Sequence, residues 1–300
     1  MVFLHGCVFV SGSEAPKTPS LDLLFGKVTI EGSPRVSVQN GLIIPLKSDE
    51  ISSSFYCFDP DLLRPAIVWT GEAASMVSTT DGRKRPSLIT AQGSVLFTTT
   101  DLPGVVPGGR HVDPRSSAVG AVPLKFGAFV KHSTFGDHAL LHYKVNTLEV
   151  EELPGIELVS DLKVFTRLLN IRGKGEYDLS IAELDKKNGR PEPTMVLGGV
   201  PYGTMVIGKP PRLAVGMSGD KVLLGSMVAG AAENQYWARL SIPGGISRIK
   251  FWYAAVNSNS DVEAFRARLA FDESELDIKK LAKTVRQKVK SVQSESRSNP

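Results

Sequence analysis

Two aspartates and an arginine stand close together in the chain, with Asp59 and Asp61 flanking Pro60 and Arg64 three residues further on. Aspartate side chains accept hydrogen bonds from backbone N–H groups and proline fixes φ, so this order favours a tight turn. Arg64 can close such a turn by pairing with a carboxylate. The local sequence offers too few oxygen ligands for calcium. We therefore expect a structural turn, with ligand binding by Asp59 and Arg64 as the alternative.

Trp69 ends the apolar run that follows this turn. A large aromatic side chain in such a run is expected in the hydrophobic core. An exposed tryptophan beside Asp and Arg side chains would instead suit a sugar ring, which stacks on aromatic faces and hydrogen-bonds to planar polar groups. Trp69 is therefore also a candidate for carbohydrate binding.

Three glutamates provide a candidate acid–base pair. Glu149 and Glu151 share one face of a predicted strand, and Glu152 lies on the other face. Glycosidases use two carboxyl groups that stand about 5–9.5 Å apart, but neighbouring carboxylates are also common on solvated strand faces. The sequence contains no Gly-x-Ser-x-Gly elbow, phosphate-binding loop or dinucleotide fingerprint. A protein without catalytic activity is the main expectation, and a glycan-active enzyme is the alternative.

Charge and cysteine content narrow the classes of partner. The net charge is +4, and residues 273–300 hold seven Lys/Arg against four Asp/Glu, so most of it lies at the C-terminal end. A nucleic-acid surface needs a concentrated basic patch on the folded body, so we expect no nucleic-acid partner. Cys7 and Cys57 form no zinc or haem-attachment motif, so no metal or cofactor is expected in this chain. The apolar residues 1–10 are shorter than the about 20 residues of a membrane span.

Short apolar runs separated by Gly, Pro and Asp fill residues 21–256. This pattern favours a mostly β fold of two packed antiparallel sheets, β-sandwich-like with Greek-key connections, over βαβ units. A propeller-like arrangement is the alternative. The clearest hairpin runs from His138 to Glu152 and turns at residues 146–147, and residues 153–155 are expected to end it. Long Gly/Pro loops include residues 103–123, and loops of this length are often functional or mobile.

The chain divides into three predicted parts. Residues 1–20 are an apolar N-terminal segment and linker, either the remnant of a secretory signal or a first strand. Residues 21–272 form the β-rich domain. Residues 273–300 predict a basic amphipathic helix and a polar tail, beginning at a capping box of Ser274 and Asp277. This helix would dock on the domain or link it to a further module, and binding to an anionic membrane surface or a partner is the alternative.

The order of several motifs resembles one family. Cys57-Phe58-Asp59 and Trp69-Thr70-Gly71 come first, followed by Asp113-Pro114-Arg115, Gly136-Asp137, Glu152-Leu153-Pro154-Gly155 and Phe165-Thr166-Arg167. Over roughly residues 21–272 this order is similar to an N-terminal domain of unknown function in large secreted proteins of planctomycetes and their relatives. In that family the domain precedes sugar-dehydrogenase-like propellers and c-type cytochrome modules.

The resemblance implies a β-rich accessory domain in the periplasm or outside the cell. It implies haem and electron transfer only for the C-terminal modules, which are absent from this sequence, so no haem is expected in this chain. The family tends to carry a Tyr and a His just before the Gly136-Asp137 turn. Ser133, Thr134 and Phe135 stand there in this sequence, so no site built on that histidine is expected.

We therefore expect a non-catalytic binding or interaction module of an extracytoplasmic carbohydrate-oxidising haem protein system. Its partner would be a polysaccharide or a neighbouring redox module, and no transmembrane span is expected. Asp113 and Arg115 would orient the ligand, Trp69 would stack on it, and Glu149 and Glu152 would accept hydrogen bonds from its hydroxyl groups. The candidate ligand-binding residues are Asp59, Arg64, Trp69, Asp113, Arg115, Glu149 and Glu152. A structural spacer is the third interpretation, favoured if Trp69, Arg115 and Glu149 are buried and paired within the chain.

Overall fold

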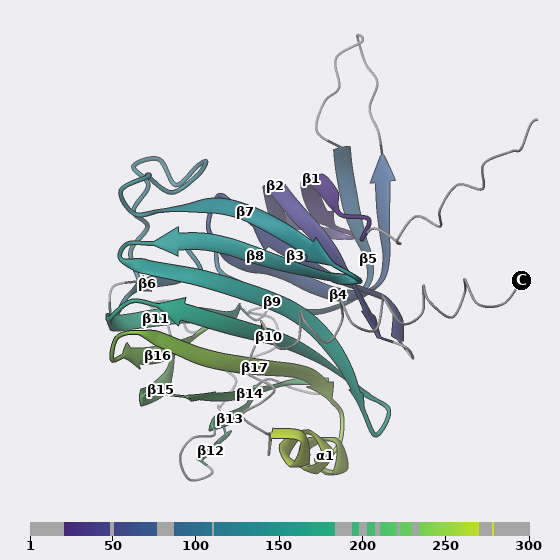
Figure 1. Ribbon diagram of the computed structural model, residues 1–300. Helices are drawn as coiled ribbons and strands as arrows, with labels where there is room; N and C mark the ends of the chain where they lie inside the picture. Colours follow the sequence, from purple (N-terminus) through teal and green to yellow (C-terminus); the bar gives the residue numbers. More distant parts are fainter. Residues whose placement is uncertain are drawn as a thin grey trace, which may run out of the picture.

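The computed structural model describes residues 21–48, 51–76, 87–109, 111–183, 194–197, 203–207, 211–220, 223–229, 234–269 and Ile278. Within these residues the fold is mostly β, with strands β1 to β17 and the helix α1 (Figure 1). The predicted N-terminal segment, residues 1–20, lies outside the described residues. So does the predicted helix at 273–300, apart from Ile278, which is helical and buried.

The first sheet has nine strands, in the order β1-β2-β3-β4-β5-β11-β16-β15, with β6 paired to β11. These strands are β1 (Leu24–Ile30), β2 (Ser33–Ser48), β3 (Ile51–Asp59), β4 (Arg64–Met76), β5 (Ser87–Thr98), β6 (Val105–Pro107), β11 (Gly175–Glu183), β15 (Leu223–Ala229) and β16 (Gln235–Ile242). β1 also pairs with β5 in parallel, which closes the first five strands into a barrel. Closure removes the exposed edges of these strands.

The second sheet has eight strands, in the order β12-β13-β14-β17-β10-β9-β8-β7. These strands are β7 (Gly127–Phe135), β8 (His138–Val145), β9 (Leu148–Val159), β10 (Leu162–Arg172), β12 (Thr194–Leu197), β13 (Gly203–Ile207), β14 (Arg212–Asp220) and β17 (Ile246–Val256). The pairings between neighbouring strands of this sheet are antiparallel. In Figure 1 this sheet lies in front of the barrel strands.

Residues of both sheets share one buried core. Strand alternation places Tyr56 and Phe58 of β3 in this core together with Leu141 and Tyr143 of β8. The Phe58 and Tyr143 ring centroids lie 5.4 Å apart, so the two sheets are in direct contact. A separate cluster of buried side chains, including Trp69, fills the interior of the barrel.

The helix α1 (Asn259–Leu269) covers part of the outer face of the second sheet, where its residue Phe265 packs with Trp252. Its first turn is fixed by a capping box. Asp261 N donates to Ser258 Oγ at 3.1 Å, and Ser258 N donates to Asp261 Oδ2 at 3.1 Å. No helix among the described residues is long and apolar enough to cross a membrane.

The mostly β fold with two sheets is confirmed, and the propeller-like alternative is not. The barrel formed by β1 to β5 was not predicted. The hairpin turn at residues 146–147 is confirmed, and so is the end of the β8–β9 pairing before residues 153–155. β9 stops pairing with β8 at Glu152 and continues to Val159 by pairing with β10. The sequence reasoning also missed α1, although Ser258 and Asp261 have the spacing of a capping box.

Candidate functional site

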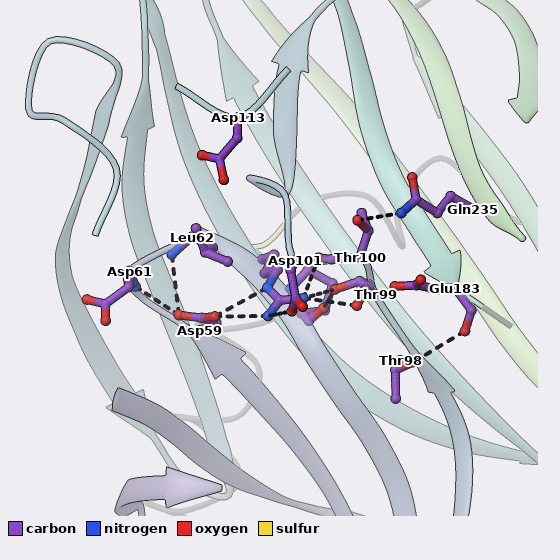
Figure 2. A network of polar contacts seen from close by, with 12 residues as sticks. Asp59, Asp61, Leu62, Thr98, Thr99, Thr100, Asp101, Asp113, Glu183 and Gln235 are labelled. Carbon is purple, nitrogen blue, oxygen red and sulfur yellow. Dashed lines mark hydrogen bonds and ion pairs between the residues drawn. The ribbon is translucent and has the colours of Figure 1, made fainter. Parts of the chain in front are cut away.

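The segment from Asp59 to Arg64 forms the predicted turn between β3 and β4. The Asp59 carboxylate accepts hydrogen bonds from the backbone N–H groups of Asp61, at 3.1 Å, and Leu62, at 3.3 Å (Figure 2). Its second oxygen accepts a hydrogen bond from Arg64 Nε at 3.2 Å. Both Asp59 and Arg64 are buried, and burial raises the pKa of Asp59 while Arg64 opposes that rise. The pair therefore holds the turn and leaves almost no surface for a ligand.

Arg64 also fixes the chain that follows β5. Its Nη1 donates to the carbonyl oxygens of Thr99, at 2.9 Å, and Thr100. Its Nη2 lies 3.2 Å from Asp101 Oδ1. Figure 2 shows Thr99, Thr100 and Asp101 close to the Asp59 turn. One buried guanidinium thus ties the end of β5 to the start of β4.

Residues 99–126, of which residue 110 is not described, form a long connection that we call the clamped loop. Gly104 brings its backbone against the turn, because its N–H donates to the Leu62 carbonyl oxygen at 2.9 Å. A Cβ atom on Gly104 would lie 2.4 Å from the Leu63 carbonyl oxygen. Only glycine permits so close an approach of two backbones.

Arg115 clamps the middle of this loop. Its Nε donates to Asp113 Oδ1 at 2.9 Å and its Nη2 to Asp113 Oδ2 at 2.8 Å. Nη1 donates to the Gly120 carbonyl oxygen at 3.0 Å, and Nη2 also donates to that of Asp101 at 2.8 Å. These hydrogen bonds from Arg115 hold the pKa of Asp113 below its usual range. The guanidinium joins three points of the loop and is largely occupied by them.

Asp178 of β11 holds an earlier part of the loop. Its carboxylate accepts hydrogen bonds from Gly109 N at 2.8 Å and from Arg239 Nε at 2.9 Å, and His111 Nε2 lies 2.8 Å from its Oδ2. Asp178 is fully buried. Burial raises its pKa, but the hydrogen bonds from Arg239, Gly109 and His111 lower it more, so the pKa lies below the ordinary value. The His111 ring also stacks on Trp237, with 4.5 Å between centroids.

The end of the clamped loop returns to the same turn. Val122 N donates to the Asp61 carbonyl oxygen at 2.9 Å, and Asn146 N donates to that of Phe126 at 2.6 Å. Ala118 has a φ of 53°. A non-glycine residue persists in this left-handed region only where the surrounding contacts hold it there. The loop therefore has one defined conformation although it contains little regular structure.

The clamped loop carries the most exposed apolar side chains of the described residues. Val112, Val119 and Leu124 are 70%, 74% and 87% exposed, whereas the other exposed large apolar residues there lie between 37% and 53%. Between Val112 and Leu124 the only charged residues are Asp113 and Arg115, which neutralise each other. The segment from Val112 to Leu124 thus presents exposed apolar side chains without unpaired charge, and the exposed Lys125 follows it directly.

Trp69, which was a candidate for stacking on a sugar, lies inside the barrel with 0% exposure. Its ring stacks on Phe55 at 5.1 Å, and its Nε1 donates to the Glu72 carbonyl oxygen at 2.9 Å. The indole therefore presents no face to a ligand.

Cys57 is a free thiol in the same cluster, and burial raises its pKa. Cys7, the other cysteine of the chain, lies outside the described residues.

The candidate residues Glu149 and Glu152 contact residues outside the clamped loop, and their environments differ. Glu149 is exposed and pairs with Lys144 at 2.8 Å. Glu152 is fully buried between the sheets, where it accepts hydrogen bonds from Tyr56 Oη, Tyr143 Oη at 2.7 Å and Arg167 Nε at 2.8 Å. Burial raises the pKa of Glu152, but Arg167 and the two hydroxyl groups lower it more, so it lies below the ordinary value.

The structure therefore gathers Asp59, Arg64, Asp113 and Arg115 around one loop and leaves Trp69, Glu149 and Glu152 elsewhere. In the described residues, no three His, Cys, Asp or Glu side chains form a group that could hold a metal ion. Sequence reasoning missed the three exposed apolar residues. The available signal was their position in a segment with neither helix nor strand period, which gives an apolar side chain no core face.

Residues 56–152 match a family described as a domain of unknown function, DUF6797, and the resemblance to such a domain is confirmed for this segment. No curated protein matches the chain. Among solved structures, a putative kojibiose phosphorylase from the human microbiome shares 11% identity at a TM-score of 0.35, covering 82% of this chain and 37% of its own. A polysaccharide lyase shares 15% at a TM-score of 0.28, covering 78% and 35%. The chain thus spans little more than a third of either protein, and at such TM-scores neither likeness bears on function.

Proposed function

We propose that this domain is a non-catalytic interaction module that docks through the clamped loop on a neighbouring protein module. The observation that carries the proposal is the coincidence of two properties in one segment. The loop backbone is fastened by Arg64, Arg115 and Asp178, and the same loop exposes Val112, Val119 and Leu124. A binding segment that is already ordered loses less conformational entropy on association.

The chemistry of the loop indicates the kind of partner. Interface cores are depleted in charged residues, and here the only charges between Val112 and Leu124 pair with each other. The partner surface is therefore expected to be apolar and poor in charge. The resemblance to secreted multidomain proteins would make this partner a redox module of a periplasmic or extracellular carbohydrate-oxidising system.

A polysaccharide is the less favoured partner. Sugar-binding sites use exposed aromatic rings, but the three tryptophans, Trp69, Trp237 and Trp252, are 0% exposed. The exposed aromatic ring of Phe25 lies on β1, outside the clamped loop. A glycan-active enzyme needs two carboxyl groups across an open cleft. Glu149 and Glu152 do not meet this requirement, because one is exposed beside Lys144 and the other is sealed in the core beside Arg167.

A structural spacer is the second candidate. It is favoured by the pairing of the predicted site residues within the chain, since Arg64 binds Asp59, Arg115 binds Asp113, and Trp69 is enclosed in the barrel. Glu149 is exposed but also paired, to Lys144. A spacer does not explain why Val119 and Leu124 of the clamped loop are exposed. An interaction module predicts that these two side chains contact a partner, whereas a spacer predicts that they do not.

Site-specific photocrosslinking separates these functions. A photoreactive amino acid is placed at position 119 or 124 in cells that make the protein, and at position 246 as a matched control, because Ile246 is apolar and 41% exposed at the start of β17. An interaction module predicts a protein adduct with the photoreactive residue at position 119 or 124 and none at position 246. This adduct should be lost when Val112 is replaced by Ser. A spacer predicts no adduct at any position. Carbohydrate binding predicts retention of the protein on a polysaccharide and no protein adduct.

A further inference from the structure

The outer face of the first sheet carries a polar cluster between β11 and β16. The core-facing residues of these strands include Leu179 and Ala238, so the alternate positions face outwards. Asp178 and Arg239 are direct partners in the strand register and form an ion pair at 2.9 Å. His111 of the clamped loop folds over this face, bonded to Asp178.

The next register pair on this face is Ser180 and Trp237. Both residues are 0% exposed, and His111 stacks on the indole ring. Neither Ser180 Oγ nor Trp237 Nε1 has a hydrogen-bond partner among the described residues. Buried polar side chains nearly always have a partner, which is either protein or a bound molecule.

Ser180 Oγ and Trp237 Nε1 determine which kind of hydrogen-bonding group could bind between them. An indole Nε1–H can only donate, so its partner must be an acceptor. A serine hydroxyl both donates and accepts. Directly opposed residues on one sheet face have Cβ atoms about 4.5–5.5 Å apart, so one small molecule can contact both side chains. An oxygen atom that accepts from Trp237 and exchanges a hydrogen bond with Ser180 satisfies both.

The charge around Ser180 and Trp237 indicates whether the bound molecule is neutral or charged. The Asp178 carboxylate is balanced by Arg239, so this ion pair offers no net positive charge for an anion. A hydroxyl oxygen, which is neutral and can donate as well as accept, fits better than a carboxylate. The His111 side chain is 11% exposed and its ring stacks on Trp237, so His111 covers one face of the buried indole.

We propose that Ser180 and Trp237 bind the oxygen of one neutral hydroxylic molecule beneath His111. Water and a hydroxyl group of a small alcohol share this chemistry. The site is independent of partner docking, although His111 connects it to the clamped loop. An occupant would complete the packing under the residue that anchors the loop at Asp178.

Nuclear magnetic resonance of the full chain with ¹⁵N-labelled tryptophan tests the site. The Trp237 indole resonance is assigned by its loss in Trp237→Phe. Trp69 is the internal control, because its Nε1–H already donates to the Glu72 carbonyl oxygen. The proposal predicts a Trp237 indole N–H cross-peak to a long-lived bound water, no such cross-peak for Trp69, and loss of the Trp237 cross-peak in Ser180→Ala.

Addition of excess ethylene glycol distinguishes the two sources of oxygen. A shift of the Trp237 indole resonance with loss of the water cross-peak means that an alcohol hydroxyl occupies the site. A cross-peak that persists unshifted means that water is the occupant. The proposal is overturned if the Trp237 indole N–H shows neither a water contact nor a shift with the alcohol. It is also overturned if Ser180→Ala leaves the cross-peak intact in a folded protein.

Discussion

Replacing Arg167 by methionine should strongly destabilise the domain, because it leaves a carboxylate buried without its counter-charge. Arg167 donates to the two oxygens of Glu152 at 2.8 and 3.1 Å, and both residues have almost no exposed surface. Two hydrogen bonds to a charged group correspond to about 3–6 kcal/mol. Removing one partner of a buried ion pair costs about 3–5 kcal/mol. We expect Arg167→Met to lower the free energy of unfolding by about 3–5 kcal/mol at neutral pH.

The pH dependence gives this prediction a second test. In the wild type the pKa of Glu152 is lowered, so its contribution to stability is present above the ordinary pKa of glutamate and is lost as pH falls below it. In Arg167→Met only the hydrogen bonds from Tyr56 and Tyr143 oppose the effect of burial, so the pKa of Glu152 rises. The cost of the variant should then shrink as pH falls from 7.5 towards 5, by up to about 1.4 kcal/mol per pH unit.

Urea unfolding followed by tryptophan fluorescence at the two pH values measures both effects. The double variant Glu152→Gln/Arg167→Met should be more stable than Arg167→Met alone, because it leaves no buried charge. Lys144→Met breaks the exposed pair with Glu149 and should cause no measurable change. If Arg167→Met lowers the free energy of unfolding by less than about 1 kcal/mol at pH 7.5, or by the same amount at both pH values, then Arg167 does not stabilise a buried Glu152 carboxylate.

Three further predictions concern the clamped loop and the extent of the domain. Arg64→Lys should lose about 2–4 kcal/mol in urea unfolding, because an ammonium group cannot replace the fork that binds Asp59 and the Thr99 carbonyl oxygen; an unchanged midpoint would contradict this role. Ala118→Gly should leave the melting temperature unchanged or raise it, because glycine relieves a φ of 53°; a clear decrease would show that the side chain, not the backbone, matters there. The isolated segment 56–152 should give the circular dichroism of an unfolded chain, because it lacks β1, which closes the barrel, and Arg167; a native-like spectrum with a cooperative melt would show that it folds alone.

Local patterns predicted the parts of the fold that depend on near neighbours. The turn from Asp59 to Arg64 follows from aspartate and proline chemistry within six residues. The hairpin at 138–152 follows from strict alternation, and Leu141 and Tyr143 are buried as that alternation requires. These features need no knowledge of distant strands, so one sequence is enough to predict them.

Other features depend on pairings between distant segments. The barrel closes because β1 pairs with β5, more than fifty residues away, and this closure encloses Trp69. Glu152 is stabilised by residues from other strands, because Arg167 balances its charge and Tyr56 donates a hydrogen bond to it. The alternation of the strand could place Glu152 on its inner face. It could not show that the Arg167 guanidinium and the two tyrosine hydroxyl groups bind the Glu152 carboxylate there.

A preformed docking surface requires that the clamped loop is ordered before any partner binds. Hydrogen–deuterium exchange of residues 99–126 in the free protein tests this most directly. An ordered loop predicts slow exchange at Gly104, Gly109 and Val122, whose N–H groups donate to Leu62, Asp178 and Asp61. It also predicts that Arg115→Gln speeds exchange between residues 113 and 120 while the sheets stay protected. Exchange of the whole loop at the rate of an unfolded chain, with the sheets still protected, would contradict the proposal of a preformed docking surface.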